Sequence, residues 1–357
     1  MNHNLKERVR RYPVAAFFIS AIVICFATLF PAIYLVPRDA GIFGVLGFYL
    51  GKIGVYSPLL AGIFVTRMIQ PGRHQGSFLR RLKVSLPVWL VALLVNMASL
   101  RITAPPSVPL TGLIMLSAPV ALLPAWAISS AVTGSDGVKR MLATLVRPRG
   151  SIVYYLVALL TFPFIHVIGA GITNALQGNP LLPQLNQLPG LSYTVLVTFF
   201  FIIFFAGGIN EESGWRGFAQ TRLQSKYSPL VTALILWVCM VIWHIPNDLL
   251  QYQQGGYLMV RIMLYPFITI LLTWIYNRTN GSILAVVIFH ASMDSMNPLM
   301  GILPITTASN ILLVAFAVLV AVWDRMWRRL PKEHPAIHKE TQHDLAASIP
   351  SQPFGAS

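Results

Sequence analysis

Long apolar stretches separated by short polar segments divide the chain into ten units. A helix needs about 20 apolar residues to cross the roughly 30 Å hydrocarbon core of a bilayer, and the stretches approach that length between charges, prolines or glycines. The predicted spans are 14–36, 42–66, 84–100, 110–132, 151–175, 193–220, 229–247, 257–276, 282–297 and 306–324. The pattern therefore predicts an all-α, polytopic transmembrane helix bundle of about ten spans (eight to ten), in which the short ninth span is the weakest.

The composition supports a membrane protein. Hydrophobic residues make up 55% of the 357 residues and charged residues only 10%, and the mean hydropathy is +0.67, which excludes an ordinary soluble domain. Cys25 and Cys239 lie inside apolar stretches with no spacing suited to a metal or a redox pair. We expect both to be small buried hydrophobes, without a disulfide framework.

The net charge of +15 follows the predicted topology. If the N-terminus is cytosolic, 21 of the 26 Lys and Arg residues lie in the two tails and in the loops on that same side, and only Arg38 and Arg101 lie in segments on the other side. By the positive-inside rule, this predicts a multi-pass protein of the cell membrane with both termini cytosolic. Because the basic residues cluster between apolar stretches, nucleic acid is not an expected partner.

Three regions are expected along the chain. Residues 1–190 hold transmembrane spans without a recognisable motif, and residues 191–324 hold the spans that carry polar side chains. Residues 325–357 are predicted to form a disordered cytosolic tail, since most of that segment is poor in large apolar residues. The first apolar stretch is too long for the core of a signal peptide and is expected to be retained as a span.

Ionisable side chains inside the spans concentrate in the second half of the chain. Each costs several kcal/mol unless it is paired or faces water, which makes it a candidate for function. The candidates are Glu211, Glu212 and Arg216 in the sixth span, His244 in the seventh, and His290 and Asp294 in the ninth. The chain has only 11 acidic residues in total, so two adjacent glutamates in an apolar segment need an explanation.

Helical spacing sorts these candidates. Glu212 and Arg216 are four residues apart and are predicted to form an ion pair, whereas Glu211 points about 100° away and stays free for another task, as a base. His290 and Asp294 are also four apart and converge on one face. Each feature also has a purely structural interpretation: Glu212 and Arg216 as a buried pair, His244 as an interfacial histidine, and His290 with Asp294 as a packing hydrogen bond. For Lys52 and Arg261, the sequence does not decide between snorkelling, contact with lipid and pairing with a carboxylate.

Glycines surround the two glutamates. Gly207, Gly208, Gly214 and Gly217 predict a close approach of a neighbouring helix or an extended peptide to this span. A carboxylate and two imidazoles drawn from three helices form a set of side chains with which Glu and His can activate water.

Three short motifs resemble those of the CPBP family of intramembrane proteases, which includes the CAAX-processing and bacteriocin-processing enzymes. Residues 211–218 read EESGWRGF, residues 243–246 read WHIP and residues 289–294 read FHASMD, similar to the family's EExxxR, FxxxH and Hxxx(N/D). The resemblance covers about residues 200–300. Two positions depart from it: Met240 replaces the phenylalanine of the second motif, and Asp294 stands where asparagine is common.

The resemblance implies an intramembrane endopeptidase that hydrolyses a peptide bond in a membrane-associated or prenylated substrate within the lipid bilayer. In this reading Glu211 and His244 activate water, His290 and Asp294 stabilise the oxyanion, and Glu212 with Arg216 orients the site. A metal-free mechanism is favoured, and zinc held by Glu211, His244 and His290 is the alternative. A non-catalytic scaffold, an immunity or maturation factor, or a transporter with the same polar network stays open.

Overall fold

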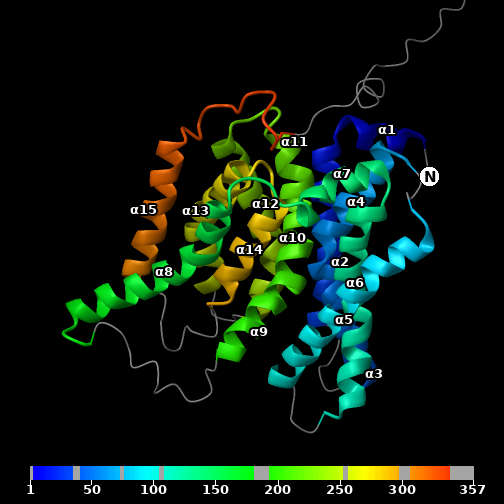
Figure 1. Cartoon of the computed structure of the whole chain (residues 1–357), viewed down its shortest axis with the longest axis horizontal. Coiled ribbons are helices and arrows are strands. Elements are labelled where there is room, and N and C mark those ends of the chain that lie inside the picture. The colour runs from blue at the N-terminus through cyan, green and yellow to red at the C-terminus, as the bar shows by residue number, and fades with distance from the viewer. Residues whose placement is uncertain are drawn as a thin grey trace, which may run out of the picture.

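The computed structural model describes residues 3–34, 41–72, 76–103, 108–180, 193–251, 256–296 and 306–337. These residues form helices, and no strand occurs among them (Figure 1). The helices of the first half are α1 (His3–Arg11), α2 (Pro13–Tyr34), α3 (Ile42–Val55), α4 (Ser57–Ile69), α5 (Phe78–Thr103), α6 (Leu110–Thr133), α7 (Asp136–Val146) and α8 (Ile152–Leu176).

The second half contains one long interrupted helix and four further helices. The interrupted helix runs through α9 (Tyr193–Ile203), the π-helical segment η2 (Phe204–Gly208), α10 (Ile209–Gly214), the π-helical segment η3 (Trp215–Gln220) and α11 (Thr221–Leu223). It is followed by α12 (Pro229–Gln251), α13 (Gly256–Arg278), α14 (Ile283–Asp294) and α15 (Thr307–Trp323).

A helical membrane bundle is confirmed, and the number of full-length spans is lower than predicted. Within the described residues, six helices are long and apolar enough to cross a membrane, or seven if the bent pair of α3 and α4 is one span. The predicted span 193–220 is the interrupted helix. The ninth prediction is α14, whose 12 residues extend only about 18 Å at ~1.5 Å per residue, so this helix cannot cross the bilayer alone.

The second predicted span, 42–66, is broken rather than continuous. Phe43–Val55 and Ser57–Ile69 meet at an angle of 58°. Pro58 lies in the first turn of α4, where its missing N–H suits the start of a helix and does not suit the interior of one. The break contacts the interrupted helix, because Tyr56 donates to the Phe205 carbonyl at 2.7 Å and the Asn210 amide donates to the Val55 carbonyl at 2.8 Å.

The predicted cytosolic loop 133–150 contains a helix, α7. Its sequence DGVKRMLATLV is amphipathic, and Val138, Met141, Leu142 and Leu145 are buried against the bundle. The apolar residues at i, i+3, i+4 and i+7 form one helix face. The loop prediction missed this helix because its apolar content is far below that of a membrane span.

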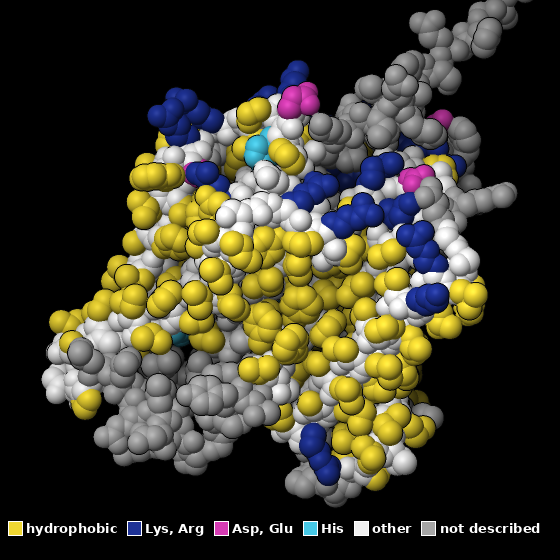
Figure 2. All heavy atoms as spheres, viewed as in Figure 1, with side chains coloured by type: hydrophobic (Ala, Val, Ile, Leu, Met, Phe, Trp, Pro, Cys, Tyr) yellow, Lys and Arg dark blue, Asp and Glu magenta, His cyan; other side chains and the backbone are white. Residues whose placement is uncertain are grey.

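On the face shown in Figure 2, most of the basic side chains lie toward the end of the molecule where α1 and α7 are found, and a broad apolar band crosses the middle of that face. Residues 325–337, the beginning of the predicted disordered tail, form turns at that end. Ala336 is completely buried, and its carbonyl accepts from the Gln224 side chain at 3.4 Å. Residues 338–357 of the predicted tail lie outside the described residues.

An aromatic cluster joins the first half of the bundle to the motif-bearing helices. Phe17 of α2 lies 5.4 Å from the ring of Trp215 and 5.1 Å from that of Phe218, between ring centroids. Trp215 in turn lies 6.0 Å from Trp243 of α12. Cys25 is buried beside this cluster as predicted, and its thiol donates to the Trp243 carbonyl at 3.4 Å.

Candidate active site

The first motif lies on α10, a short α-helical segment between two π-helical segments. Glu211 and Glu212 belong to α10, and Arg216 follows in η3. π-Helical turns inside a longer helix are frequent at functional sites. A Cβ on Gly214 would lie 2.4 Å from the Pro58 carbonyl oxygen, so the predicted close approach of a neighbouring helix is confirmed at this glycine.

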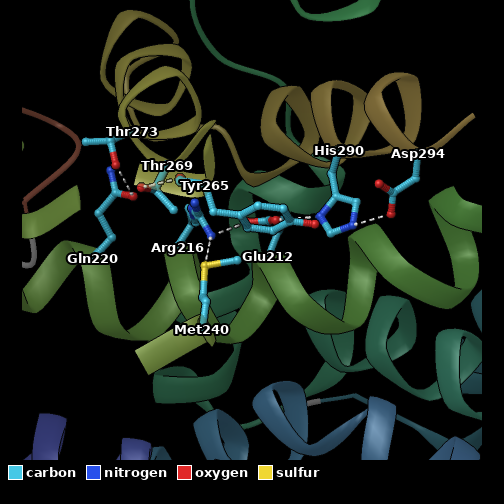
Figure 3. Close-up of polar contacts among 9 residues, drawn as sticks. All are labelled: Glu212, Arg216, Gln220, Met240, Tyr265, Thr269, Thr273, His290 and Asp294. Atoms are coloured by element: carbon cyan, nitrogen blue, oxygen red, sulfur yellow. Dashed lines mark hydrogen bonds and ion pairs between the residues drawn. The ribbon is translucent and has the colours of Figure 1, made fainter. Parts of the chain in front are cut away.

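Glu212 is fully buried and has two partners. Its Oε2 lies 2.9 Å from Arg216 Nη1, which confirms the predicted ion pair, and its Oε1 lies 2.7 Å from His290 Nδ1. The second contact was not predicted from the sequence. Arg216 Nη1 also lies 3.5 Å from the Met240 sulfur, so the residue that replaces phenylalanine in the second motif contacts the first motif directly (Figure 3).

His290 faces a carboxylate on each side of its ring. An ionised carboxylate only accepts hydrogen bonds, so Nδ1 donates to Glu212, while Nε2 lies 3.4 Å from Asp294 Oδ2. This second distance is long for a charge-assisted hydrogen bond. The Asp294 side chain is 31% exposed, in contrast to the fully buried Glu212. The predicted convergence of His290 and Asp294 is confirmed, with Asp294 the looser partner.

His244 is held in one orientation by its own helix. Its Nδ1 lies 2.7 Å from the Met240 carbonyl oxygen, and a carbonyl can only accept, so Nδ1 carries a proton. In the neutral ring Nε2 is then the acceptor. The ring packs edge-on against Trp243 and Tyr265, with centroids 4.6 and 6.1 Å away. The sequence alone could not show which ring nitrogen of His244 carries the proton.

Glu211 contrasts with its neighbour Glu212. It is only 7% exposed, and its Oε2 is buried without a hydrogen-bond partner in the described part of the chain. Direct contacts join Glu212, Arg216, His290 and Asp294 into one polar centre. Met240, which contacts both Arg216 and the His244 ring, connects this centre to α12, and Glu211 lies next to Glu212 on α10.

Two further charged residues lie near His244: Asp248, which was not predicted from the sequence, and Arg261, whose role the sequence left open. Asp248 escaped attention because the predicted seventh span ended at 247, whereas α12 continues to Gln251. Its Oδ2 lies 2.5 Å from Arg261 Nε. The signal that could have found Asp248 is its position four residues after His244, which places both on one helix face.

Lys52, the other cation whose role the sequence left open, lies apart from this centre on α3, and its Nζ atom is 5.3 Å from the centroid of the Phe48 ring.

The arrangement of these residues does not fit a zinc site. Among the described residues, no three His, Cys, Asp or Glu side chains come together in a cluster that could hold a metal ion. Of the three ligands considered, His290 has Nδ1 on Glu212 and Nε2 facing Asp294.

Comparison with known proteins supports the resemblance drawn from the motifs. Residues 192–296 match the Rce1-like family model, described as type II CAAX prenyl endopeptidase Rce1-like. The chain is also similar to the CAAX prenyl protease 2 of Methanococcus maripaludis, with 28% identity over 130 residues. This alignment covers 34% of the chain and 48% of the relative, so the chain spans about half the length of the protein that it matches. Both findings confirm the resemblance to the CAAX-processing family, and the model match includes all three motifs.

Proposed function

We propose that this protein is an intramembrane endopeptidase that hydrolyses a peptide bond near the C-terminus of a prenylated, membrane-associated protein. The observation that carries the proposal is the difference between the two adjacent glutamates. Both oxygens of Glu212 are engaged, one by the Arg216 ion pair and one by His290, whereas Oε2 of the buried Glu211 has neither a hydrogen-bond nor an ion-pair partner among the described residues. A buried carboxylate that acts together with an imidazole acceptor is suited to remove a proton from water.

In this mechanism Glu211 is the general base. A water between Glu211 and His244 loses a proton to the carboxylate, while Nε2 of His244 accepts the second hydrogen bond and orients the oxygen toward the substrate carbonyl. The proton then passes to the leaving amine, as general acid–base catalysis requires. The Met240 carbonyl contributes by fixing the ring of His244 in the orientation that leaves Nε2 free.

His290 is suited to stabilise the oxyanion that forms on the substrate carbonyl. In this scheme His290 is doubly protonated: Nδ1 donates to Glu212 at 2.7 Å, and this bond sets the direction of the Nε2–H group that donates to the oxyanion. The substrate oxygen takes the place of the weakly held Asp294 carboxylate at Nε2. Donors fixed in advance in a low-dielectric site act strongly on developing charge. Glu212 and Arg216 are positioning residues in this scheme, since they act through His290.

The experiment uses the full chain in lipid vesicles with a farnesylated reporter peptide. We expect cleavage by the natural sequence. We also expect it from the control Lys52→Gln, which removes a charged side chain from another span. Glu211→Gln should remain folded and lose cleavage. Cleavage that persists in Glu211→Gln would contradict the proposal. If the purified natural sequence cleaves no peptide, and Glu211→Gln still supports the cellular phenotype of the protein, a non-catalytic scaffold or an immunity or maturation factor would be favoured.

We also propose that both termini face the cytosol, as the asymmetry of the basic residues predicts. Reporter domains fused before residue 3 and after residue 337 should be accessible from the cytosolic side. A reporter in the segment around Arg101 should be accessible only from the opposite side. Opposite locations for the two terminal reporters would contradict this orientation.

A further inference from the structure

A second polar cluster lies one helical turn beyond His244. Asp248 follows His244 by four residues on α12, and Tyr265 follows Arg261 by four residues on α13. The two helix faces meet: Asp248 Oδ2 lies 2.5 Å from Arg261 Nε, and the Arg261 Cζ lies 4.6 Å from the centroid of the Tyr265 ring. The Tyr265 ring also packs against His244, so the cluster is continuous with the candidate active site.

Arg261 has donors that nothing in the described part of the chain uses. The residue is 9% exposed, and its Nη1 is buried without a hydrogen-bond partner. A guanidinium presents five N–H donors in a planar fork that matches a carboxylate in a two-point contact. A cation in this position, inside a span and beside a reacting centre, is suited to hold an anionic group of the substrate.

We propose that Arg261 binds the terminal carboxylate of the substrate, and that Asp248 is the counter-ion that holds the guanidinium when the site is empty. This inference rests on the proposed function. A CAAX sequence ends its protein chain, and three residues follow its prenylated cysteine, so such a substrate carries a free carboxylate three residues beyond that cysteine. Asp248 lies about 6 Å beyond His244 along α12 at ~1.5 Å per residue. The three residues that follow the cysteine reach at most about 10 Å when extended. They are therefore long enough to span this distance and to bring the terminal carboxylate to Arg261.

The test compares two farnesylated peptides that differ only at their last atom group, one ending in a carboxylate and the other in an amide. The quantity measured is the ratio of kcat/KM for the acid to that for the amide, on the same vesicle preparation. This ratio does not depend on the fraction of the protein that is folded. We expect the natural sequence to favour the acid by about 10- to 100-fold, the range of a charge-assisted contact, chiefly through KM.

Variants of the two partners should move this ratio in opposite directions. Arg261→Gln should bring it close to one, because the cation is lost, and Arg261→Lys should retain part of the preference. Asp248→Asn should raise the ratio, because the competing carboxylate is removed while a hydrogen-bond acceptor is kept. Lys52→Gln is the matched control and should leave the ratio unchanged. A merely structural ion pair would lower cleavage of both peptides equally in either variant.

The outcomes separate this inference from the function on which it rests. If the natural sequence cleaves both peptides equally well, Arg261 does not read the terminal carboxylate and the proposed function stands. If it cleaves neither, the proposed function fails, and binding of the same two peptides, measured by displacement of a fluorescent farnesylated peptide, decides the role of Arg261. Equal binding of acid and amide, or a preference that survives Arg261→Gln, overturns the inference.

Discussion

The Nδ1 atom of His290 lies 2.7 Å from the Oε1 atom of Glu212, so one hydrogen bond joins the first and third motifs across 78 residues of sequence. The same carboxylate pairs with Arg216. Glu212 thus has two structural roles, one for each carboxylate oxygen. It neutralises the buried guanidinium of Arg216, and it fixes the direction of the His290 imidazole. Oε2 of the adjacent Glu211 has no partner in the part of the chain that the structure describes, which is why we assign the role of the base to Glu211 and not to Glu212.

Arg216→Ala should reduce the amount of folded protein as well as its activity. The substitution leaves the fully buried Glu212 without its cation, and breaking a buried pair in this way costs about 3–5 kcal/mol. The measurement is the yield of monodisperse protein in detergent together with its thermal unfolding temperature. Arg101→Ala, which removes an exposed arginine, is the control and should behave as the natural sequence does. Normal yield and stability of Arg216→Ala would show that the pair is dispensable.

Gly214→Ala should be destabilising for a different reason. A Cβ at this position would lie 2.4 Å from the Pro58 carbonyl oxygen, and a backbone atom at the break between α3 and α4 cannot yield without moving that helix. Overpacking of this kind costs about 1–3 kcal/mol.

Gly51→Ala supplies a matched control on α3, because its Cβ would meet only the end of the Leu29 side chain at 3.8 Å. Replacing glycine by alanine inside a helix is otherwise favourable. Thermal unfolding in detergent should therefore separate the two variants. Equal stability would mean that the contact between α4 and α10 is looser than the geometry indicates.

The sequence was sufficient for the features that depend on local spacing. The Glu212–Arg216 pair and the convergence of His290 and Asp294 both follow from positions four residues apart on a helix, and the apolar stretches located the helices of the bundle. The interrupted form of the sixth span was not visible from the sequence. Gly208 and Gly214 lie close to Val287 and Pro58 of other helices, and such contacts depend on the packing of the whole bundle.

The contacts that join different helices could not be predicted from the sequence. Nothing in the spacing of Glu212 and His290 indicates that they meet, and the pairing of Asp248 with Arg261 depends on how α12 packs against α13. The break at Tyr56 was also missed, although Pro58 marked it, because the stretch 42–66 is apolar throughout and hydropathy does not report direction. The contacts at this break join the first half of the chain, which lies outside the family match, to the helix that carries the first motif.

Asp294→Asn should retain activity or raise it, by up to about 10-fold. The carboxylate faces His290 Nε2 at 3.4 Å, where it competes with the substrate oxygen and repels the negative charge that develops there. An amide keeps the shape and removes that charge. The measurement is kcat on the farnesylated reporter peptide, with KM expected to change little. A tenfold fall in kcat would show instead that the carboxylate itself takes part in the reaction.

Glu211 and His244 are the two residues to which we assign the activation of water. Glu211→Gln keeps the shape of the side chain and removes the proton acceptor, so kcat should fall by about 10²–10⁴-fold, the usual contribution of acid–base catalysis. His244→Ala should cause a loss of similar size. Because the two side chains act on one water, the double variant should be little worse than either single variant. Thermal unfolding should be almost unchanged in Glu211→Gln, because Oε2 of Glu211 has no hydrogen-bond partner among the described residues that the substitution could remove.

Glu212→Gln is the matched control for this pair, since it makes the same chemical change one residue along the chain. It removes the charge that Arg216 requires and should therefore lower both the unfolding temperature and the activity, while Glu211→Gln lowers the activity alone. A chelator added to the natural sequence should leave cleavage intact; inhibition that zinc reverses would support the metal alternative. If losses from Glu211→Gln and His244→Ala multiply in the double variant, the two residues act in separate steps, and the shared water has to be abandoned.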